Sequence, residues 1–247
     1  MDEGAQVPDG FCKDSSLSDH SEHQGRHFYG RRIGHPLSAL QQARIDDMLP
    51  KLRPDVSKPA PQPLTDLFGG KAREVWLEIG FGAGEHLDWQ AKHNPDVGII
   101  GAEPFINGMA QLLTRADASG LANIRLYDDE AQILLGWLPP ASISRAFILF
   151  PDPWPKKRHH KRRIVSPTTV AALARVMTPG SELRVATDIA DYVRTTLLAV
   201  TNNPNFIWPA LTPDDWRVRS PDWPPTRYEA KAVEAGRQCY YFRFLRR

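Results

Sequence analysis

The feature that most constrains the fold is an alternation of short apolar strands and helices that begins after residue 63. Strands are predicted at 75–79, 97–102, 124–127, 146–150, 183–186, 206–208 and 239–245, and helices at 85–93, 105–118, 167–177 and from Asp188 to about Val200. Because consecutive parallel strands need helical crossovers, this order predicts an α/β fold, a parallel sheet with helices on both faces. Ligands of such sheets bind at the carboxyl ends of the strands, so functional residues are expected there.

The chain ahead of the sheet divides into two parts. Residues 1–25 hold six acids and one base, a net charge of −5, with little to bury, and predict a disordered acidic tail. Residues 26–63 form a basic segment, a helix between Leu37 and Leu52 and a proline-rich linker. Residues 64–247 are predicted to form the α/β domain. Since the whole chain carries +2, residues 26–247 carry +7, which favours a polyanionic partner.

Composition excludes several classes of protein. A hydrophobic content of 41% is enough for an ordinary core, which excludes wholesale disorder. No apolar run approaches the roughly 20 residues that cross a bilayer, and the acidic start lacks the layout of a secretory signal. The two cysteines, Cys12 and Cys239, make neither a disulfide framework nor a metal site. We therefore expect a soluble, cytoplasmic protein with no membrane partner and no metal.

The first two strands end in residues that are typical of a nucleotide site. Gly80, Gly82 and Gly84 stand between a strand and a helix, where small residues let the backbone approach a ligand and the helix offers free N–H groups. Glu103 ends the second strand, where an acid accepts hydrogen bonds from ribose hydroxyls. Glu78 suits a ligand with an ammonium group, such as the methionine part of S-adenosylmethionine (SAM). The GxGxG spacing lacks the third-glycine offset of the dinucleotide fingerprint, although the motif alone leaves both ligands open.

The third strand is followed by three consecutive acids, Asp128, Asp129 and Glu130. A carboxylate at this position could accept a hydrogen bond from the exocyclic amine of adenine. The sequence leaves open which of the three does so, and a solvated turn is the alternative.

The fourth strand leads into residues 151–155, Pro-Asp-Pro-Trp-Pro. The prolines stiffen this loop and so fix the carboxylate of Asp152 and the ring of Trp154, a pair that suits a purine base. A basic tract of six cations and two histidines follows at 156–163. Such a run is commonly a solvated surface, but beside this loop it favours contact with nucleic-acid phosphates. Asp188 and the Thr-Arg-Tyr-Glu segment 226–229 are either helix starts or substrate contacts.

These segments together resemble one family, the tRNA (guanine-N7)-methyltransferases, which modify guanosine 46 in the variable loop of tRNA. The matching segments are 77–84, 101–104, 123–126, 150–159, 161–163, 186–188 and 226–229, in the order of the family. The resemblance spans about 28–244, and its most specific part is the loop and basic tract from 150 onwards. It implies a Rossmann-like, SAM-dependent methyltransferase fold with a mostly parallel seven-stranded sheet, tRNA as partner, and SAM converted to S-adenosylhomocysteine without a metal.

The resemblance also implies roles for individual residues. The predicted cofactor-binding residues are Glu78, Gly80, Gly82, Gly84, Glu103, Glu130 and Asp152. Asp152 is in addition the predicted catalytic residue, at both cofactor and target base. The predicted tRNA contacts are Lys156, Arg158, His159, Lys161, Arg162, Arg163, Asp188, Thr226, Arg227, Tyr228 and Glu229. One departure concerns the adenine side, where the family commonly has Asp before Ala and this chain has Glu130.

Three other functions stay open at this point. A methyltransferase of the adenine exocyclic amine has a similar loop, Asp-Pro-Pro-aromatic, whereas here one proline separates Asp152 from Trp154. A non-catalytic RNA-binding protein could keep the fold, but the intact glycines and acids argue against it. A dinucleotide oxidoreductase is weakened by GxGxG and by the lack of a substrate domain. The sequence does not say which tRNAs are preferred, and it leaves the oligomeric state open, with a monomer favoured.

Overall fold

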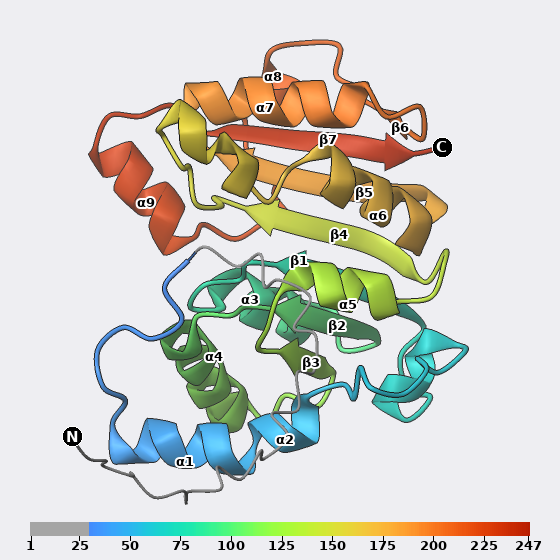
Figure 1. Ribbon diagram of the computed structural model, residues 1–247, viewed down its shortest axis with the longest axis vertical. Helices are drawn as coiled ribbons and strands as arrows, with labels where there is room; N and C mark the ends of the chain where they lie inside the picture. The colour runs from blue at the N-terminus through green and yellow to red at the C-terminus, as the bar shows by residue number, and fades with distance from the viewer. Residues whose placement is uncertain (1–29) are drawn as a thin grey trace, which may run out of the picture.

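The computed structural model describes residues 30–247, so the predicted acidic tail at 1–25 lies outside the described residues. The sheet has seven strands in the order β3-β2-β1-β4-β5-β7-β6 (Figure 1). The strands are β1 Glu74–Ile79, β2 Val97–Ala102, β3 Ile124–Tyr127, β4 Ile143–Leu149, β5 Met177–Thr187, β6 Phe206–Ile207 and β7 Tyr240–Arg246. β1 to β5 are parallel, and β7 runs antiparallel between β5 and β6. This confirms the predicted mostly parallel α/β sheet.

The strand order reverses between β1 and β4. From β1 the chain continues to β2 and β3 on one side of the sheet, and then returns to β4 and β5 on the other. β1 and β4 pair in parallel register, with Ile79 opposite Ile148, so the segments that follow them leave the sheet side by side. In open α/β sheets this switch point is where the crevice for a ligand forms.

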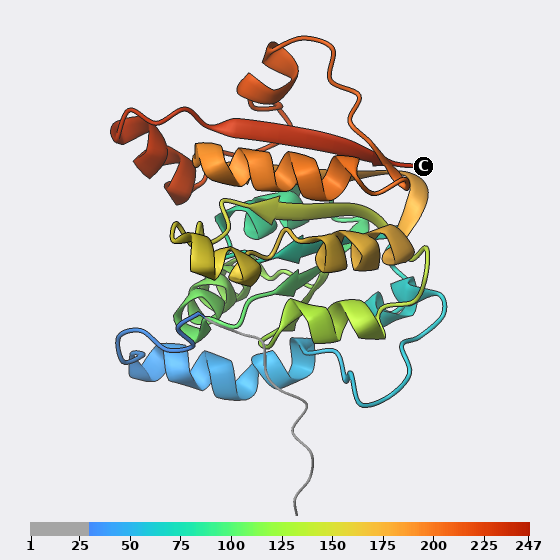
Figure 2. The ribbon, with the colours of Figure 1, turned by 45° about the horizontal axis from the view of Figure 1, so that its top comes forward.

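Helices cover both faces of the sheet. α3 Glu85–His93, α4 Ile106–Ser119 and α9 Arg227–Glu234 share a buried cluster with Trp76 and Phe147. On the opposite face, α5 Ala131–Trp137, α6 Pro167–Val176 and α7 Ala190–Thr201 share a cluster with Leu77 and Phe242. Figure 2 shows α5, α6 and α7 side by side over this second face. Neighbouring strand residues such as Trp76 and Leu77 therefore point to opposite faces, and both faces are buried, as expected for parallel strands.

The structure differs from the predicted elements in several places, among them β5, which begins at Met177 and not at 183. The predicted helix at 37–52 is divided into α1 Ala39–Asp47 and α2 Leu49–Leu52, because Pro50 lacks the N–H that would continue α1. No helix was predicted after β3, yet α5 begins directly after the three acids; its seven residues are too few to establish a helical period. The four-residue α8 Asp214–Arg217 was not predicted either.

The segment ahead of the sheet packs against the helices that cover the sheet. α1 lies against α4, where Arg44 Nε is 3.0 Å from Asp117 Oδ2. The proline-rich linker contacts α5, because the carbonyl of Lys58 accepts a hydrogen bond of 2.6 Å from Trp137 Nε1. At the carboxyl end of β3 the same segment is held by Arg32, which pairs with Asp129, and by Arg53, which pairs with Asp128. Within residues 30–247 there is no helix long and apolar enough to cross a membrane and no cluster of side chains arranged to hold a metal.

The close approach of α4 to the glycine turn yields a first prediction. A Cβ on Gly108 would stand 2.3 Å from the carbonyl oxygen of Gly82, so Gly108→Ala must displace the turn. We expect this variant to lose about 1–3 kcal/mol of unfolding free energy, measured by urea denaturation. Gly136→Ala is the matched control, because a Cβ there meets open space on α5, and it should gain up to about 1 kcal/mol. Equal effects of the two substitutions would contradict the predicted close packing.

Candidate active site

A cavity of about 470 Å³ opens at the carboxyl ends of β1 and β4. Its walls come from the glycine turn at 79–82, the loop at 102–105 after β2, residues 130–132 at the start of α5, the loop after β4, and Tyr228 of α9, with Gly30, Arg31, Arg162 and Ile164 completing it. The volume lies in the range of pockets that enclose a small organic ligand. The crevice that the strand order predicts therefore exists and is walled by loops from both sides of the switch point.

The three glycines of the turn have different positions. All three have φ in the left-handed region, 73° at Gly80, 56° at Gly82 and 77° at Gly84, which side chains other than glycine rarely adopt. Gly80 and Gly82 line the cavity. Gly84 is instead buried at the start of α3, where a Cβ would collide with Leu112. Two glycines thus face the cavity, and the third lets α3 pack on α4.

Glu103 connects two walls of the cavity. Its Oε2 accepts a hydrogen bond of 2.8 Å from Gly82 N, and its Oε1 accepts one of 2.9 Å from Phe105 N. A carboxylate has about four acceptor positions, so two remain for a ligand in the cavity. Burial raises the pKa of Glu103 to about 7, against the two backbone donors, and the negative charges of Asp152 and Glu78 add to this.

Glu78 does not line the cavity and lies behind the glycine turn, nearly fully buried. Its Oε2 is 2.8 Å from Nδ1 of His86 on α3. The amide nitrogen of Gln90 is 3.1 Å from His86 Nε2 and donates to the carbonyl of Asp222 at 3.0 Å. Because a carbonyl can only accept, Gln90 supplies the hydrogens, so His86 accepts at Nε2 and donates from Nδ1 to Glu78. His86 belongs to none of the sequence motifs described above.

Two of the three acids after β3 pair with arginines of the N-terminal segment, and all three differ in position. Asp128 Oδ1 is 2.9 Å from Arg53 Nε, and Asp129 Oδ1 is 3.1 Å from Arg32 Nη1. Glu130, in contrast, lines the cavity. Arg31, which precedes Arg32 in the chain, also lines the cavity, and sequence reasoning missed it. The one sequence signal for Arg31 was the basic composition of this segment, whose charge is opposite to that of the acids after β3.

The loop after β4 is held in an unusual backbone conformation. Phe150 and Trp154 have φ values of 48° and 41°, in the left-handed region, at a cost of roughly 1–3 kcal/mol each. Phe150 N donates to the carbonyl of Ala186 at 2.8 Å, and the Arg162 guanidinium lies 5.0 Å from the centre of the Trp154 ring. Asp152 faces the cavity between them. Although Asp152 is exposed, the surrounding walls remove part of its hydration and raise the pKa of its carboxyl.

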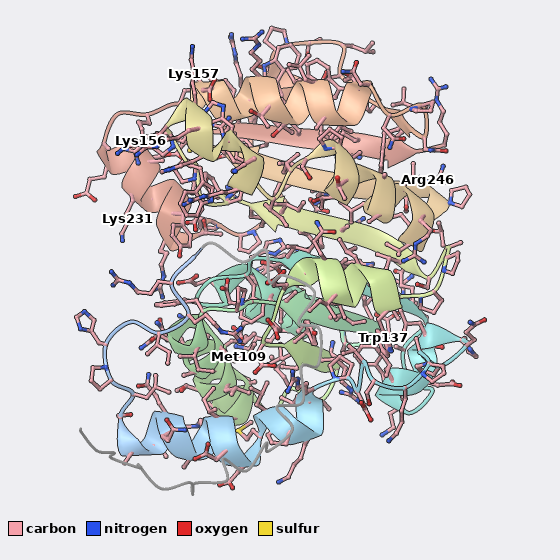
Figure 3. All side chains as sticks on the ribbon, viewed as in Figure 1. Met109, Trp137, Lys156, Lys157, Lys231 and Arg246 are labelled. Atoms are coloured by element: carbon pink, nitrogen blue, oxygen red, sulfur yellow. The ribbon has the colours of Figure 1, made fainter. Side chains whose placement is uncertain are left out.

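The basic tract divides into exposed and inward-facing residues. It folds as the short 3₁₀ helix η2 Lys157–Arg162. Lys156, Lys157, Arg158 and Lys161 are exposed, and Figure 3 shows Lys156 and Lys157 at the same end of the molecule as Lys231 of α9. His159 lies edge-on to the Trp154 ring at 5.9 Å. Partial desolvation, and then the neighbouring cations, lower the pKa of His159. Arg163, a predicted tRNA contact, is buried.

The remaining predicted substrate contacts have protein partners. Asp188 Oδ2 accepts from Arg237 Nε at 2.6 Å. Thr226 caps α9 and accepts from the backbone N–H of Glu229 at 3.2 Å, so this segment is a helix start. Glu229 Oε1 accepts hydrogen bonds from Arg219 Nε at 2.9 Å and from Tyr241 Oη at 2.8 Å. Arg227 donates to Glu85 and, at 3.2 Å, to Gln111. Of residues 226–229 it is Tyr228 that lines the cavity, with its ring beside Gly82.

Comparisons with known proteins give three further findings. A family model described as "Putative methyltransferase" matches residues 72–242. Two similar proteins are called tRNA (guanine-N(7)-)-methyltransferase. The one from Chelativorans sp. strain BNC1 is 48% identical over 227 residues, which cover 92% of this chain and 98% of that protein. The one from Ruegeria pomeroyi is 52% identical over 227 residues, which cover 90% of this chain and 94% of that protein. The solved structure of TrmN from Thermus thermophilus matches 75% of this chain and 48% of that one, with a TM-score of 0.52 and 16% identity, a likeness of fold.

The raised pKa of Glu103 predicts how stability depends on pH. The folded state binds this proton more tightly than the unfolded chain, so the contribution is fully present below the ordinary pKa of glutamate and is lost as pH rises through about 7. Between pH 5 and pH 8 the wild type should therefore lose about 2 kcal/mol of unfolding free energy relative to Glu103→Gln. Denaturation of both proteins at the two pH values measures this difference, and parallel pH profiles would contradict it.

Proposed function

The chain belongs to the tRNA (guanine-N7)-methyltransferase family, and on that premise we propose that it transfers a methyl group from SAM to N7 of guanosine 46 in the variable loop of tRNA. The observation that carries the proposal is the cavity at the switch point. It has Glu103 on one wall and Asp152 on another, and the exposed cations of the basic tract begin two residues after Trp154, which also lines the cavity. Because tRNA is the substrate, the proposal also implies a cytoplasmic enzyme.

The residues around the glycine turn fit an adenosyl ligand. Glu103 keeps two acceptor positions, which suit the two ribose hydroxyls, and Glu130 lies on the adjoining wall as an acceptor for the adenine amine. Gly80 and Gly82 leave room for the ligand beside the backbone. Glu78, oriented by His86, contributes a carboxylate behind the turn that offsets the positive charge of the methionine part. When bound, SAM supplies an already activated methyl group.

The target atom determines what the protein must do. Guanine N7 has a free lone pair and no proton, so its attack needs no general base. The lone pair forms the new N–C bond while the bond between that methyl group and sulfur breaks and its electron pair stays on sulfur, so the positive charge passes to the guanine ring. Catalysis then consists mainly of alignment, which can contribute roughly 7–11 kcal/mol. Asp152 accepts hydrogen bonds from the guanine N–H groups and offsets the ring charge, while Trp154 beside it limits how the base can enter.

The exposed part of the basic tract is proposed to bind the tRNA backbone. Lys156, Lys157, Arg158 and Lys161 have no carboxylate partner within salt-bridge distance among the ion pairs of residues 30–247, so their charges are available to phosphates. Each phosphate contact releases counterions, and tRNA affinity should therefore fall steeply as salt rises.

Identifying the modified nucleoside tests the activity. The protein is incubated with methyl-labelled SAM and a tRNA transcript, and the digested RNA is analysed by mass spectrometry. We expect 7-methylguanosine from the parent transcript and none from a matched transcript with adenosine at position 46. Methylation of an adenine amine would instead support the alternative methyltransferase, and absence of both methyl transfer and SAM binding would support a non-catalytic RNA-binding protein.

Asp152→Ala tests the proposed catalytic residue. Loss of a group that stabilises developing charge costs about 100-fold to 1,000-fold in kcat, and we expect a loss of this order with little change in tRNA affinity. The measurements are single-turnover methyl transfer and filter binding. Asp214→Ala, an exposed acid on α8, is the control and should keep full activity. An Asp152→Ala variant that transfers methyl at the wild-type rate would refute the assigned role.

A further inference from the structure

Arg163 ends a tract of cations, but its environment is that of an interior residue. It is 3% exposed, whereas Lys156, Lys157, Arg158 and Lys161 of the same tract are exposed. Arginine is almost never fully buried unless its charge and its N–H groups have partners. The partners of Arg163 therefore indicate what this residue does.

The guanidinium of Arg163 joins two segments. Its Nε donates to the carbonyl of Pro153 at 3.0 Å. From α7, Asp191 Oδ2 accepts from Nη2 at 2.6 Å, and Thr195 Oγ1 lies 2.5 Å from Nη1. The buried ring of Tyr192 lies beneath the guanidinium, with its centre 5.0 Å away. Each of the three guanidinium nitrogens thus has a partner within the protein, and none faces the solvent where RNA phosphates would be.

The segment that Arg163 holds is the loop that carries Asp152. Pro153 stands between Asp152 and Trp154, and Trp154 has its backbone in the left-handed region. Such a conformation persists only where the surroundings over-determine it. Pro151, Pro153 and Pro155 have no N–H to donate, so the loop has few backbone donors and a bond to one of its carbonyl groups is a main anchor. The bond from Arg163 to Pro153 provides this anchor one residue away from Asp152.

We infer that Arg163 is a positioning residue for methyl transfer, which clamps the carbonyl of Pro153 to α7 and thereby holds Asp152 toward the cavity, and that it is not a tRNA contact. The inference rests on the proposed function. This positioning role requires the planar guanidinium of arginine, because it must bind three partners that lie in different directions. A lysine keeps the charge but has a single nitrogen and cannot satisfy the carbonyl, the hydroxyl and the carboxylate together.

Arg163→Lys is the test. Displacement of a positioned group by ~1 Å can cost roughly 100-fold in rate, so we expect kcat at saturating tRNA and SAM to fall at least about ten-fold. The dissociation constant of tRNA and its salt dependence should stay within about two-fold of wild type. Deuterium exchange in the peptide that covers 150–157 should become faster. Arg194→Lys, the same change at an exposed position of α7, should alter none of these.

Arg158→Ala is the comparison for an RNA contact, since Arg158 is exposed in the same tract. It should weaken tRNA binding and lower the salt slope by about one phosphate, neither of which Arg163→Lys should do. The inference is overturned if Arg163→Lys follows the pattern of Arg158→Ala. It is also overturned if Arg163→Lys lowers thermal stability but keeps the wild-type kcat and exchange rate, because that is a purely structural role.

Asp191→Ala keeps the inference testable if Arg163→Lys does not fold. The Asp191 side chain is 55% exposed, so its removal disturbs packing little while it takes away one anchor of the clamp. It should lower kcat by about three-fold or more without changing tRNA affinity, and full activity would count against the clamp. A wild-type protein that methylates no tRNA would refute the proposed function itself, whereas active wild type with unaffected Arg163→Lys and Asp191→Ala would refute the clamp alone.

Discussion

The parallel pairing of β1 with β4 is the constraint on which the rest of the site depends. It places the ends of two strands side by side although they are separated by two other strands in the chain. The glycine turn and the loop that carries Asp152 therefore leave the sheet in the same direction and face each other across one cavity. Glu103, at the end of the neighbouring strand, then ties the turn to the loop after β2 through two backbone N–H groups.

Loops built from glycine and proline need support from charged groups behind them. Glycines make the turn after β1 permissive, and prolines remove donors from the loop after β4. In each place a buried ionisable side chain supplies a hydrogen-bond partner for the backbone. Glu103 accepts a hydrogen bond from the N–H of Gly82, and Arg163 donates one to the carbonyl of Pro153. Glu78 has a similar support in His86. A buried charge is costly without partners, so these groups favour the one loop conformation in which their hydrogen bonds are made.

Much of the fold and part of the site followed from the sequence. The strand pattern predicted a mostly parallel sheet, and the cavity is lined by Gly80, Gly82, Glu103 and Asp152, which were predicted because they follow strands. Elements with weak local signals were missed, such as α5 with its seven residues. Likewise, nothing in the sequence separated Thr226 as a helix cap from Thr226 as a substrate contact, because the same hydroxyl suits both.

The sequence by itself determined which chemical groups stand at the strand ends and how stiff their loops are, because both follow from local order along the chain. Within a series of similar residues, such as the three acids at 128–130 or the basic tract at 156–163, the tertiary structure alone decided which residue faces the cavity and which turns inward. Glu130 rather than Asp128 or Asp129 lines the cavity because Arg53 and Arg32, far away in the chain, take the other two. Arg163 differs from its cationic neighbours because Asp191 and Thr195 lie where it turns inward. Such choices depend on partners that only folding brings within hydrogen-bond distance.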